Sequence, residues 1–209
     1  LGGARVIQNE RVLAMLHGQF AAVVFSLLAV TWLVSSRAWS RVDSAHHRDG
    51  EDVAPKAGET TDRQAQPTLL PLAIVATLVV LIQYVLGGLL RHHGTALVEH
   101  MGLAVLAMGL VIAASVKALM SGNAWLKRSG WAMLVVVLLQ VVLGGVTFIT
   151  KYGLRATGYV AVRGTPLQTL TASSHTVLGM ILVATCVVFT VKAARLATVA
   201  GTHGLKIRP

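Results

Sequence analysis

The chain has 209 residues, of which 55% are hydrophobic and only 12% are charged, and its mean hydropathy is +0.69. This composition excludes an ordinary soluble globular protein, in which about 25% of the residues are charged. The formal net charge of +10 is spread over the ends of apolar runs rather than gathered in one basic cluster, so we expect no nucleic-acid partner.

Five apolar runs are each long enough to cross a bilayer core of roughly 30 Å, which takes about 20 helical residues. They fall at residues 11–36, 69–91, 96–119, 129–150 and 171–194. A membrane β-barrel would instead show shorter segments of alternating hydrophobicity. The sequence therefore predicts an all-α, polytopic membrane helical bundle with five transmembrane helices.

One motif occurs three times: Leu-Gly-Gly, then a loop, then a histidine on the next apolar run. Its copies span Leu1–His17, Leu86–His100 and Leu143–His175. Repeats of this size indicate a duplicated unit, here a pair of membrane helices that carries one histidine. Because residue 1 stands inside a motif and is not Met, we expect the chain to be truncated and at least one preceding helix to be missing.

Residues 37–68 separate the first run from the other four. They include six acidic residues, five basic residues and two prolines but few large apolar side chains. This composition predicts a disordered, solvated linker, with His46 and His47 in water. The expected divisions are a last helix of an incomplete N-terminal half (1–36), the linker (37–68), a complete C-terminal four-helix half (69–196) and a basic tail (197–209).

The Lys and Arg residues are distributed unequally between the two sides of the expected membrane. Twelve of the 18 stand on the side of the linker and the C-terminus, and six stand on the other side. Since positive charge favours the inner side, we expect the linker and the C-terminus to be cytoplasmic. The bacterial cell membrane is favoured over the mitochondrial inner membrane.

Three histidines, His17, His100 and His175, stand near one membrane face at the starts of apolar runs. Neutral imidazole is a good iron ligand, and two imidazoles from facing helices can hold a haem from both sides. Each histidine is followed within four residues by a glycine, which leaves room for a flat macrocycle. We therefore expect haem as the cofactor, although a histidine at a helix end can also serve only as a hydrogen-bonding residue.

Other polar side chains accompany this pattern. Arg91 and His92 follow the second run, where each can cap the helix or contact a haem propionate. Gln83 and Gln140 stand three residues before a Leu-Gly-Gly, and for them an interhelical hydrogen bond is favoured over a cofactor contact. The Gly-Gly pairs are expected to allow close helix approach and to end the helix cleanly, and Cys186 is expected to be a small buried hydrophobe.

Three motifs, taken in order, resemble the heme A synthase family. Leu1–Val6 with Asn9–Gly18 resembles its fourth helix region, Leu86–His92 with His100 resembles the start of its second half, and Thr171–Gly179 resembles its last helix. The resemblance covers nearly all of the chain except the linker. It implies an eight-helix fold in two four-helix halves, which this chain matches from helix four onward.

The resemblance implies that His100 and His175 ligate the iron of a resident haem b in the C-terminal half. His17 would be an iron ligand and catalytic residue of the substrate half, with Glu10 as a further catalytic candidate. The implied reaction oxidises the C8 methyl of haem O to a formyl group by successive hydroxylations and dehydration, giving haem A. Implied partners are haem O, haem A, haem O synthase, cytochrome oxidase assembly factors and membrane lipid.

Two other functions would use the same histidine pair. A cytochrome b-like membrane electron carrier would exchange electrons with quinone and would need no substrate pocket around His17. A non-enzymatic, haem-carrying assembly protein would keep the ligands and lack a catalytic glutamate. Because the substrate half is incomplete, we expect this chain alone to bind haem b without forming haem A.

Overall fold

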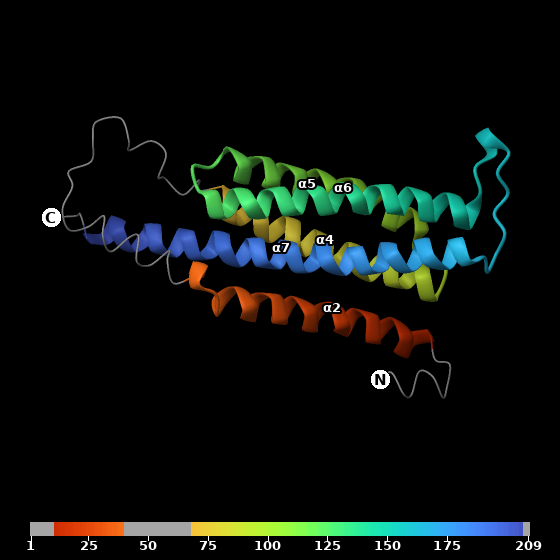
Figure 1. Ribbon diagram of the computed structural model, residues 1–209, viewed down its shortest axis with the longest axis horizontal. Coiled ribbons are helices and arrows are strands. Elements are labelled where there is room, and N and C mark those ends of the chain that lie inside the picture. Colours follow the sequence, from red (N-terminus) through yellow and green to blue (C-terminus); the bar gives the residue numbers. More distant parts are fainter. Residues whose placement is uncertain (1–10, 40–67, 207–209) are drawn as a thin grey trace.

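The computed structural model describes residues 11–39 and 68–206 (Figure 1). Within these residues every long element is a helix, and five of the helices are long and apolar enough to cross a membrane. They are α2 (Arg11–Val34), α4 (Leu69–His92), α5 (Leu97–Met120), α6 (Ala124–Tyr152) and α7 (Pro166–Lys206), with a short 3₁₀ turn η1 (Arg155–Thr157) between the last two. The prediction of an all-α membrane bundle is confirmed.

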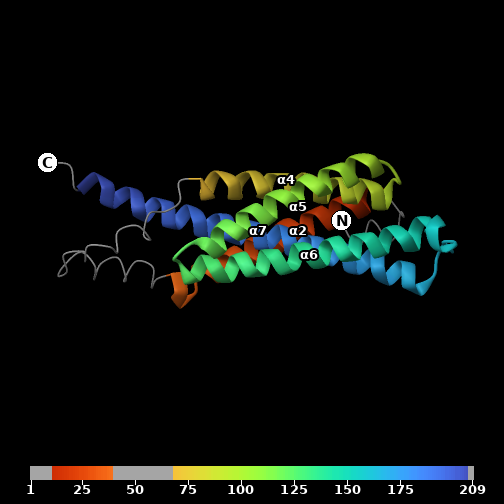
Figure 2. The same ribbon diagram turned by 90° about the horizontal axis from the view of Figure 1, so that it is seen from above.

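Helices α4, α5, α6 and α7 form a four-helix bundle in which each helix packs against its neighbours and the first contacts the last. Helix α2 lies outside the bundle, against α7 and α4 (Figures 1 and 2). The α4–α5 and α6–α7 connections lie at one end of the molecule, and the α5–α6 turn lies at the other (Figure 1).

The bundle core is made of small and medium apolar side chains contributed by all four helices. Val111, Ala114 and Phe189 are completely buried, and Cys186 is 1% exposed, as expected for a small hydrophobe. Small residues let membrane helices approach closely, and this close packing provides much of their attraction. Thr190 adds a polar tie, since its hydroxyl lies 2.8 Å from that of Thr77 and joins α7 to α4.

The second glycine of the first Gly-Gly pair positions α2. A Cβ atom at Gly88 would lie 2.5 Å from Nε2 of Gln19 and 3.2 Å from Cγ of Met15, both on α2. Beside this contact, the Tyr84 hydroxyl donates to the carbonyl of Gly18 at 3.5 Å. A side chain at this position would force Gln19 and Met15 of α2 to shift.

The two Gly-Gly pairs among the described residues, Gly87-Gly88 and Gly144-Gly145, lie inside helices, so the clean helix ends expected there are wrong. Helix α4 continues past Gly88 to His92, and α6 continues past Gly145 to Tyr152. In a bilayer no water can replace a broken backbone hydrogen bond, and a helix is therefore kept through glycines that would weaken it in water.

Two helices are longer than the apolar runs that predicted them. Helix α6 begins at Ala124 rather than at residue 129, because the Asn123 side chain accepts hydrogen bonds from the backbone N–H groups of Trp125 and Leu126, at 2.9 and 3.2 Å. Helix α7 extends through Lys206, into the residues expected to form a basic tail.

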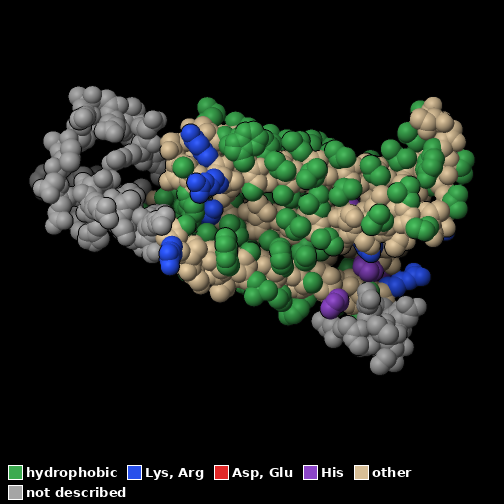
Figure 3. Space-filling model, viewed as in Figure 1, with side chains coloured by type: hydrophobic (Ala, Val, Ile, Leu, Met, Phe, Trp, Pro, Cys, Tyr) green, Lys and Arg blue, Asp and Glu red, His purple; other side chains and the backbone are tan. Residues whose placement is uncertain are grey.

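The outer surface suits a lipid environment. On α2 the side chains of Phe20, Leu27, Leu28 and Trp32 are each at least 60% exposed. Figure 3 shows hydrophobic side chains over the middle of the visible face and Lys and Arg side chains toward its two ends. Such an apolar band with charged ends identifies an integral membrane protein.

Candidate functional site

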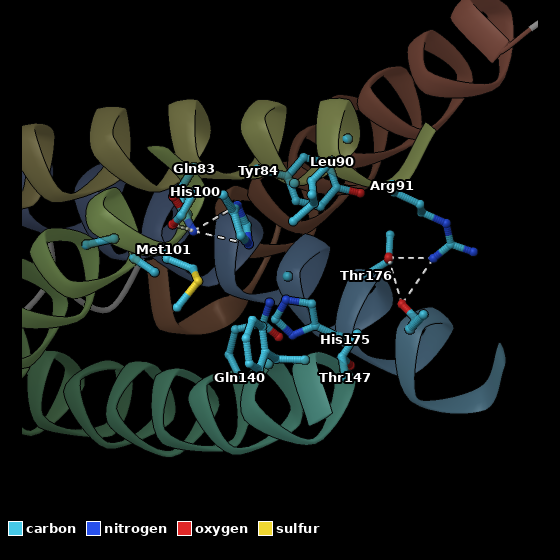
Figure 4. Close-up of a pocket in the computed structure, with 18 of the residues that line it drawn as sticks. Gln83, Tyr84, Leu90, Arg91, His100, Met101, Gln140, Thr147, His175 and Thr176 are labelled. Atoms are coloured by element: carbon cyan, nitrogen blue, oxygen red, sulfur yellow. Dashed lines mark hydrogen bonds between the residues drawn. The ribbon is translucent and has the colours of Figure 1, made fainter. Parts of the chain in front are cut away.

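A cavity of about 460 Å³ lies inside the bundle, toward the end where α4 joins α5. All five helices contribute to its wall, and α2 contributes Met15, Gly18 and Gln19. The wall is mostly apolar, with a few polar side chains that converge on the interior (Figure 4). This size and composition are typical of small-molecule and cofactor sites.

His100 and His175 face each other across this cavity (Figure 4). His100 comes from the start of α5 and His175 from α7, and their ring centres lie 6.4 Å apart with the rings at 88° to each other. The two histidines are 75 positions apart in the sequence. The structure therefore brings together the pair that the repeated motif singled out.

Each histidine packs against the first glycine of the Gly-Gly pair on the preceding helix. A Cβ atom at Gly87 would lie 3.1 Å from Cε1 of His100, and a Cβ atom at Gly144 would lie 3.1 Å from Cε1 of His175. Contacts this short are rare for a real Cβ atom. The glycines thus set the depth to which each imidazole enters the bundle.

Gln83 holds the His100 ring. Its Nε2 lies 3.0 Å from Nδ1 of His100 and donates to the carbonyl oxygen of His100 at 2.9 Å. This interhelical contact agrees with the role favoured for the glutamine. Because Gln83 also lines the cavity, it belongs to the site as well.

Several buried polar atoms at the cavity make no hydrogen bond. They are Oε1 of Gln83, Oε1 of Gln140, Oγ1 of Thr147 and Nδ1 of His175. A buried polar atom without a partner costs about 1–3 kcal/mol. Four such atoms around one cavity indicate that the site is built for a polar or metal-containing ligand.

Two cationic side chains stand at the mouth of the cavity. The Arg91 guanidinium, at the end of α4, donates to Oγ1 of Thr176 at 2.6 Å and to the carbonyl oxygen of Ala172 at 3.0 Å, both on α7. Lys151, at the end of α6, lies with Nζ 5.4 Å from the centre of the Tyr152 ring. His92 also lines the cavity, whereas His93 forms the C-cap of α4.

The residues present fit a haem better than a bare metal ion. Among the described residues there is no group of three or more His, Cys, Asp or Glu side chains that could hold a metal ion. A macrocycle supplies four ligands itself and requires only two from the protein. A ligating imidazole nitrogen lies about 2 Å from the metal and about 1.1 Å from its own ring centre, so a pair on one iron has ring centres about 6 Å apart.

The measured spacing of 6.4 Å matches that requirement. An edge-to-face contact between two rings can have a similar spacing. That alternative accounts neither for the cavity nor for the polar atoms without partners around it. The spacing of the two rings and the available donors therefore fit a haem, which His100 and His175 would hold.

Other predicted site residues lie apart from this pair. His17 is exposed on α2 and is not part of the cavity wall, although its neighbours Gly18 and Gln19 are. Gly102, expected beside a macrocycle, is exposed and outside the wall. Glu10 lies outside the described residues, as do His46 and His47.

The structure adds residues that the sequence motifs did not single out. Tyr84 and Lys151 line the cavity, and Thr147 places its unpartnered hydroxyl there. Tyr84 directly follows Gln83 and Thr147 lies three residues after Gly144, so both flank the repeated motif. Their closeness in sequence to the repeated motif could have identified these two residues.

Comparison with known proteins gives no relative. No protein-family model, no curated protein and no solved structure matches the chain. The function therefore has to be inferred from the residues of the site and from the three sequence motifs.

Proposed function

We propose that the α4–α7 bundle is the haem b-binding half of a heme A synthase, with His100 and His175 as the axial ligands. The observation that carries this proposal is the imidazole pair, 6.4 Å apart across a cavity, on two copies of one helix-hairpin motif. Bound haem b would supply one-electron transfer at this position.

The charges at the cavity mouth support a tetrapyrrole as the ligand. Haem carries two propionate groups, and Arg91 and Lys151 provide two cations on different helices at one end of the cavity. Arginine and lysine bind carboxylates by charge-assisted hydrogen bonds. Arg91 and Lys151 would hold the propionates, with His92 beside them, while the apolar wall would exclude water from the ring.

Oxidation of the C8 methyl of haem O to a formyl group, giving haem A, is proposed for the synthase as a whole. Within the chain, His17 on α2 is the residue assigned to the substrate haem, and Glu10 is the further catalytic candidate. Since His17 lies outside the cavity wall, the substrate haem would occupy a second site. The proposed setting is a bacterial cell membrane, with haem O synthase and oxidase assembly factors as partners.

The test is the optical spectrum of the purified chain in detergent, oxidised and reduced. We expect a low-spin haem b spectrum in the unmutated protein and its loss in His100→Ala and in His175→Ala. His93→Ala is the matched control, because His93 is exposed at the end of α4 and outside the cavity wall.

Absence of haem from the unmutated protein after reconstitution with haem b would refute the proposal. A low-spin spectrum that persists in either alanine variant would refute the assignment of that ligand. Haem O uptake at a second site, lost in His17→Ala, is expected of the synthase. A protein that binds haem b alone and is reduced by quinol would instead be the electron carrier.

A further inference from the structure

We propose that Gln83 and Gln140 are positioning residues for the two histidines. In the loaded protein each carboxamide oxygen accepts a hydrogen bond from Nδ1–H of its histidine, which leaves Nε2 free for iron. This inference rests on the proposed haem site and specifies how the chain sets the state of its two ligands.

The need for such a partner follows from the chemistry of imidazole. A neutral ring has one N–H group, and a nitrogen that carries the proton cannot donate a lone pair to a metal. Which nitrogen keeps the proton is decided by the hydrogen bond made on the other side of the ring. A ligating histidine therefore almost always donates its remaining N–H to an oxygen acceptor.

Gln83 is in position for this role but faces His100 with its nitrogen. Nε2 lies 3.0 Å from Nδ1 and 3.4 Å from Nε2 of His100, and an amide nitrogen can only donate. The shorter contact makes Nδ1 the acceptor, with the ring proton on Nε2. Meanwhile Oε1 of Gln83 is buried and has no partner.

A half-turn of the Gln83 carboxamide reverses the polarity of this contact. The oxygen and nitrogen of a carboxamide have nearly the same outline, so the turn needs little additional space. It brings Oε1 to Nδ1 and gives the buried oxygen its hydrogen bond. The turn breaks the bond from Nε2 to the His100 carbonyl and would bring Oε1 toward that carbonyl oxygen, so the carboxamide has to shift away from the carbonyl as it turns. We therefore expect the turn only together with iron ligation at Nε2.

Gln140 offers the same oxygen to the second histidine. Its Oε1 and Nδ1 of His175 are both buried, and neither makes a hydrogen bond. Figure 4 shows Gln140 beside His175. The Gln140 amide also lies against α7 one turn beyond His175, since a Cβ atom at Gly179 would be 3.1 Å from its Nε2.

The pairing satisfies two buried atoms at once. When His175 ligates through Nε2, its Nδ1 carries a proton that requires an acceptor. Oε1 of Gln140, on the side chain that Figure 4 shows beside His175, is a buried acceptor without a partner. In both hairpins the glutamine stands four residues before the glycine that contacts the histidine. One helix turn therefore places the amide and the glycine on the same side of each imidazole.

The test compares Gln83→Leu, Gln140→Leu, Gln83→Glu and Gln140→Glu in the full chain loaded with haem b. Two quantities are measured: the rate of haem transfer to excess apomyoglobin, and the midpoint potential from a spectroscopic titration. Gln168→Leu is the control, because this amide bonds to Gly164 in the α6–α7 connection and to Thr150 near the end of α6, and lies outside the cavity wall.

We expect each leucine variant to lose haem roughly ten- to a hundredfold faster, the usual effect of removing a partner of a ligating histidine. The glutamate variants restore an oxygen acceptor and should retain haem as the unmutated chain does. Their midpoint potentials should be lower, since a carboxylate makes the imidazole more basic and favours ferric iron. The control should match the unmutated chain in both quantities.

Unchanged haem transfer and potential in the leucine variants would overturn the inference while leaving the haem site intact. Failure of the unmutated chain to bind haem would overturn the proposed function as well. If a leucine variant does not fold, as judged by helical circular dichroism, the isosteric glutamate variant tests the role instead. Its midpoint potential is then compared with that of the unmutated chain. An unchanged potential would then refute the role.

Discussion

The hairpin of α4 and α5 and the hairpin of α6 and α7 carry the same motif but complete it differently. In both, a Cβ atom added to the first glycine of the pair would lie 3.1 Å from Cε1 of the histidine. His100 in the first hairpin is held by Gln83, whereas Nδ1 of His175 in the second has no partner. The shared glycine contact is steric and requires only backbone placement, while the polar contact also depends on how each amide is oriented.

The second glycines differ as well. Gly88 in the first hairpin is covered by α2, but a Cβ atom at Gly145 in the second would meet no atom within 4 Å. The connections also differ: α4 and α5 are joined by residues 93–96, and α6 and α7 by residues 153–165. The first hairpin is thus more firmly fixed around its histidine than the second.

The largest difference between the hairpins is expected in the unfolding free energy that is lost when the first glycine of each pair is replaced by alanine. In Gly87→Ala the new Cβ atom meets a ring fixed by Gln83, and overpacking of this kind costs about 1–3 kcal/mol of unfolding free energy. In Gly144→Ala the His175 ring can move, so a cost below about 1 kcal/mol is expected.

Thermal unfolding of the haem-free protein in detergent measures both costs. Gly102→Ala is the control, because a Cβ atom at that α5 position meets nothing within 4 Å. The higher helix propensity of alanine, about 1 kcal/mol, applies to all three variants and cancels in the comparison. Equal losses at Gly87 and Gly144 would mean that Gln83 does not fix His100.

A smaller difference, in the affinity for haem and for its dimethyl ester, is expected between the two cations at the cavity mouth. Arg91 already bonds to α7, whereas Lys151 lies over the neighbouring Tyr152 ring. A hydrogen bond to a charged group contributes about 1.5–3 kcal/mol. Arg91→Gln and Lys151→Gln should therefore each weaken haem binding by about tenfold or more.

Haem dimethyl ester, which lacks the propionate charges, separates the two roles. Lys151→Gln should leave ester binding unchanged, while Arg91→Gln should weaken it too, because the tie between α4 and α7 is lost. Equilibrium titration with both porphyrins measures this, with Arg155→Gln in the outer connection as the control. Equal loss of haem and ester binding in Lys151→Gln would exclude a carboxylate contact.

The smallest difference is expected in the stability contributed by two lysines at the opposite end of the hairpins. Each hairpin has one lysine there that is bonded to a hydroxyl. Lys192 of α7 is 9% exposed, donates to Oγ of Ser129 at 2.6 Å and lies over the Trp125 ring. Lys117 of α5 donates to Oγ1 of Thr68 in an exposed position. Lys192→Met should cost about 1–2 kcal/mol and Lys117→Met about 0.5 kcal/mol or less.

Unfolding followed by circular dichroism in detergent compares the two lysine variants. A double variant with both substitutions should show the sum of the two costs, because the sites do not share a partner. A gain in stability for Lys192→Met would show that burying the ammonium costs more free energy than its contacts with Ser129 and Trp125 contribute.

The sequence predicted the helices and the proximity of the two histidines because both depend on simple periodic features. Runs of apolar residues determine membrane spans, and a duplicated motif places His100 and His175 at equivalent positions of two hairpins. Their role as iron ligands stays a prediction. The start of α6 was missed because Asn123 caps a helix whose first turns, with Lys127 and Arg128, are polar.

The walls of the cavity could not be predicted in the same way. Which side of a membrane helix faces the interior depends on its rotation against its neighbours, and nearly every side of these helices is apolar. Lys151 lies just beyond the apolar run predicted at 129–150, and Gly102 was expected beside the macrocycle, yet Lys151 lines the cavity and Gly102 does not. The polarity of the Gln83 contact likewise depends on the placement of atoms rather than on residue type.

The contact between α4 and α7 has a consequence for how the protein is made. Helices enter the membrane in the order of synthesis, so α4, α5 and α6 precede α7. Until α7 arrives, the groove beside His100 lacks its second imidazole and the oxygens that bind Arg91. On the proposed function, haem loading would therefore be a late step in biogenesis, and a nascent chain released before Pro166 would have no closed pocket to receive haem.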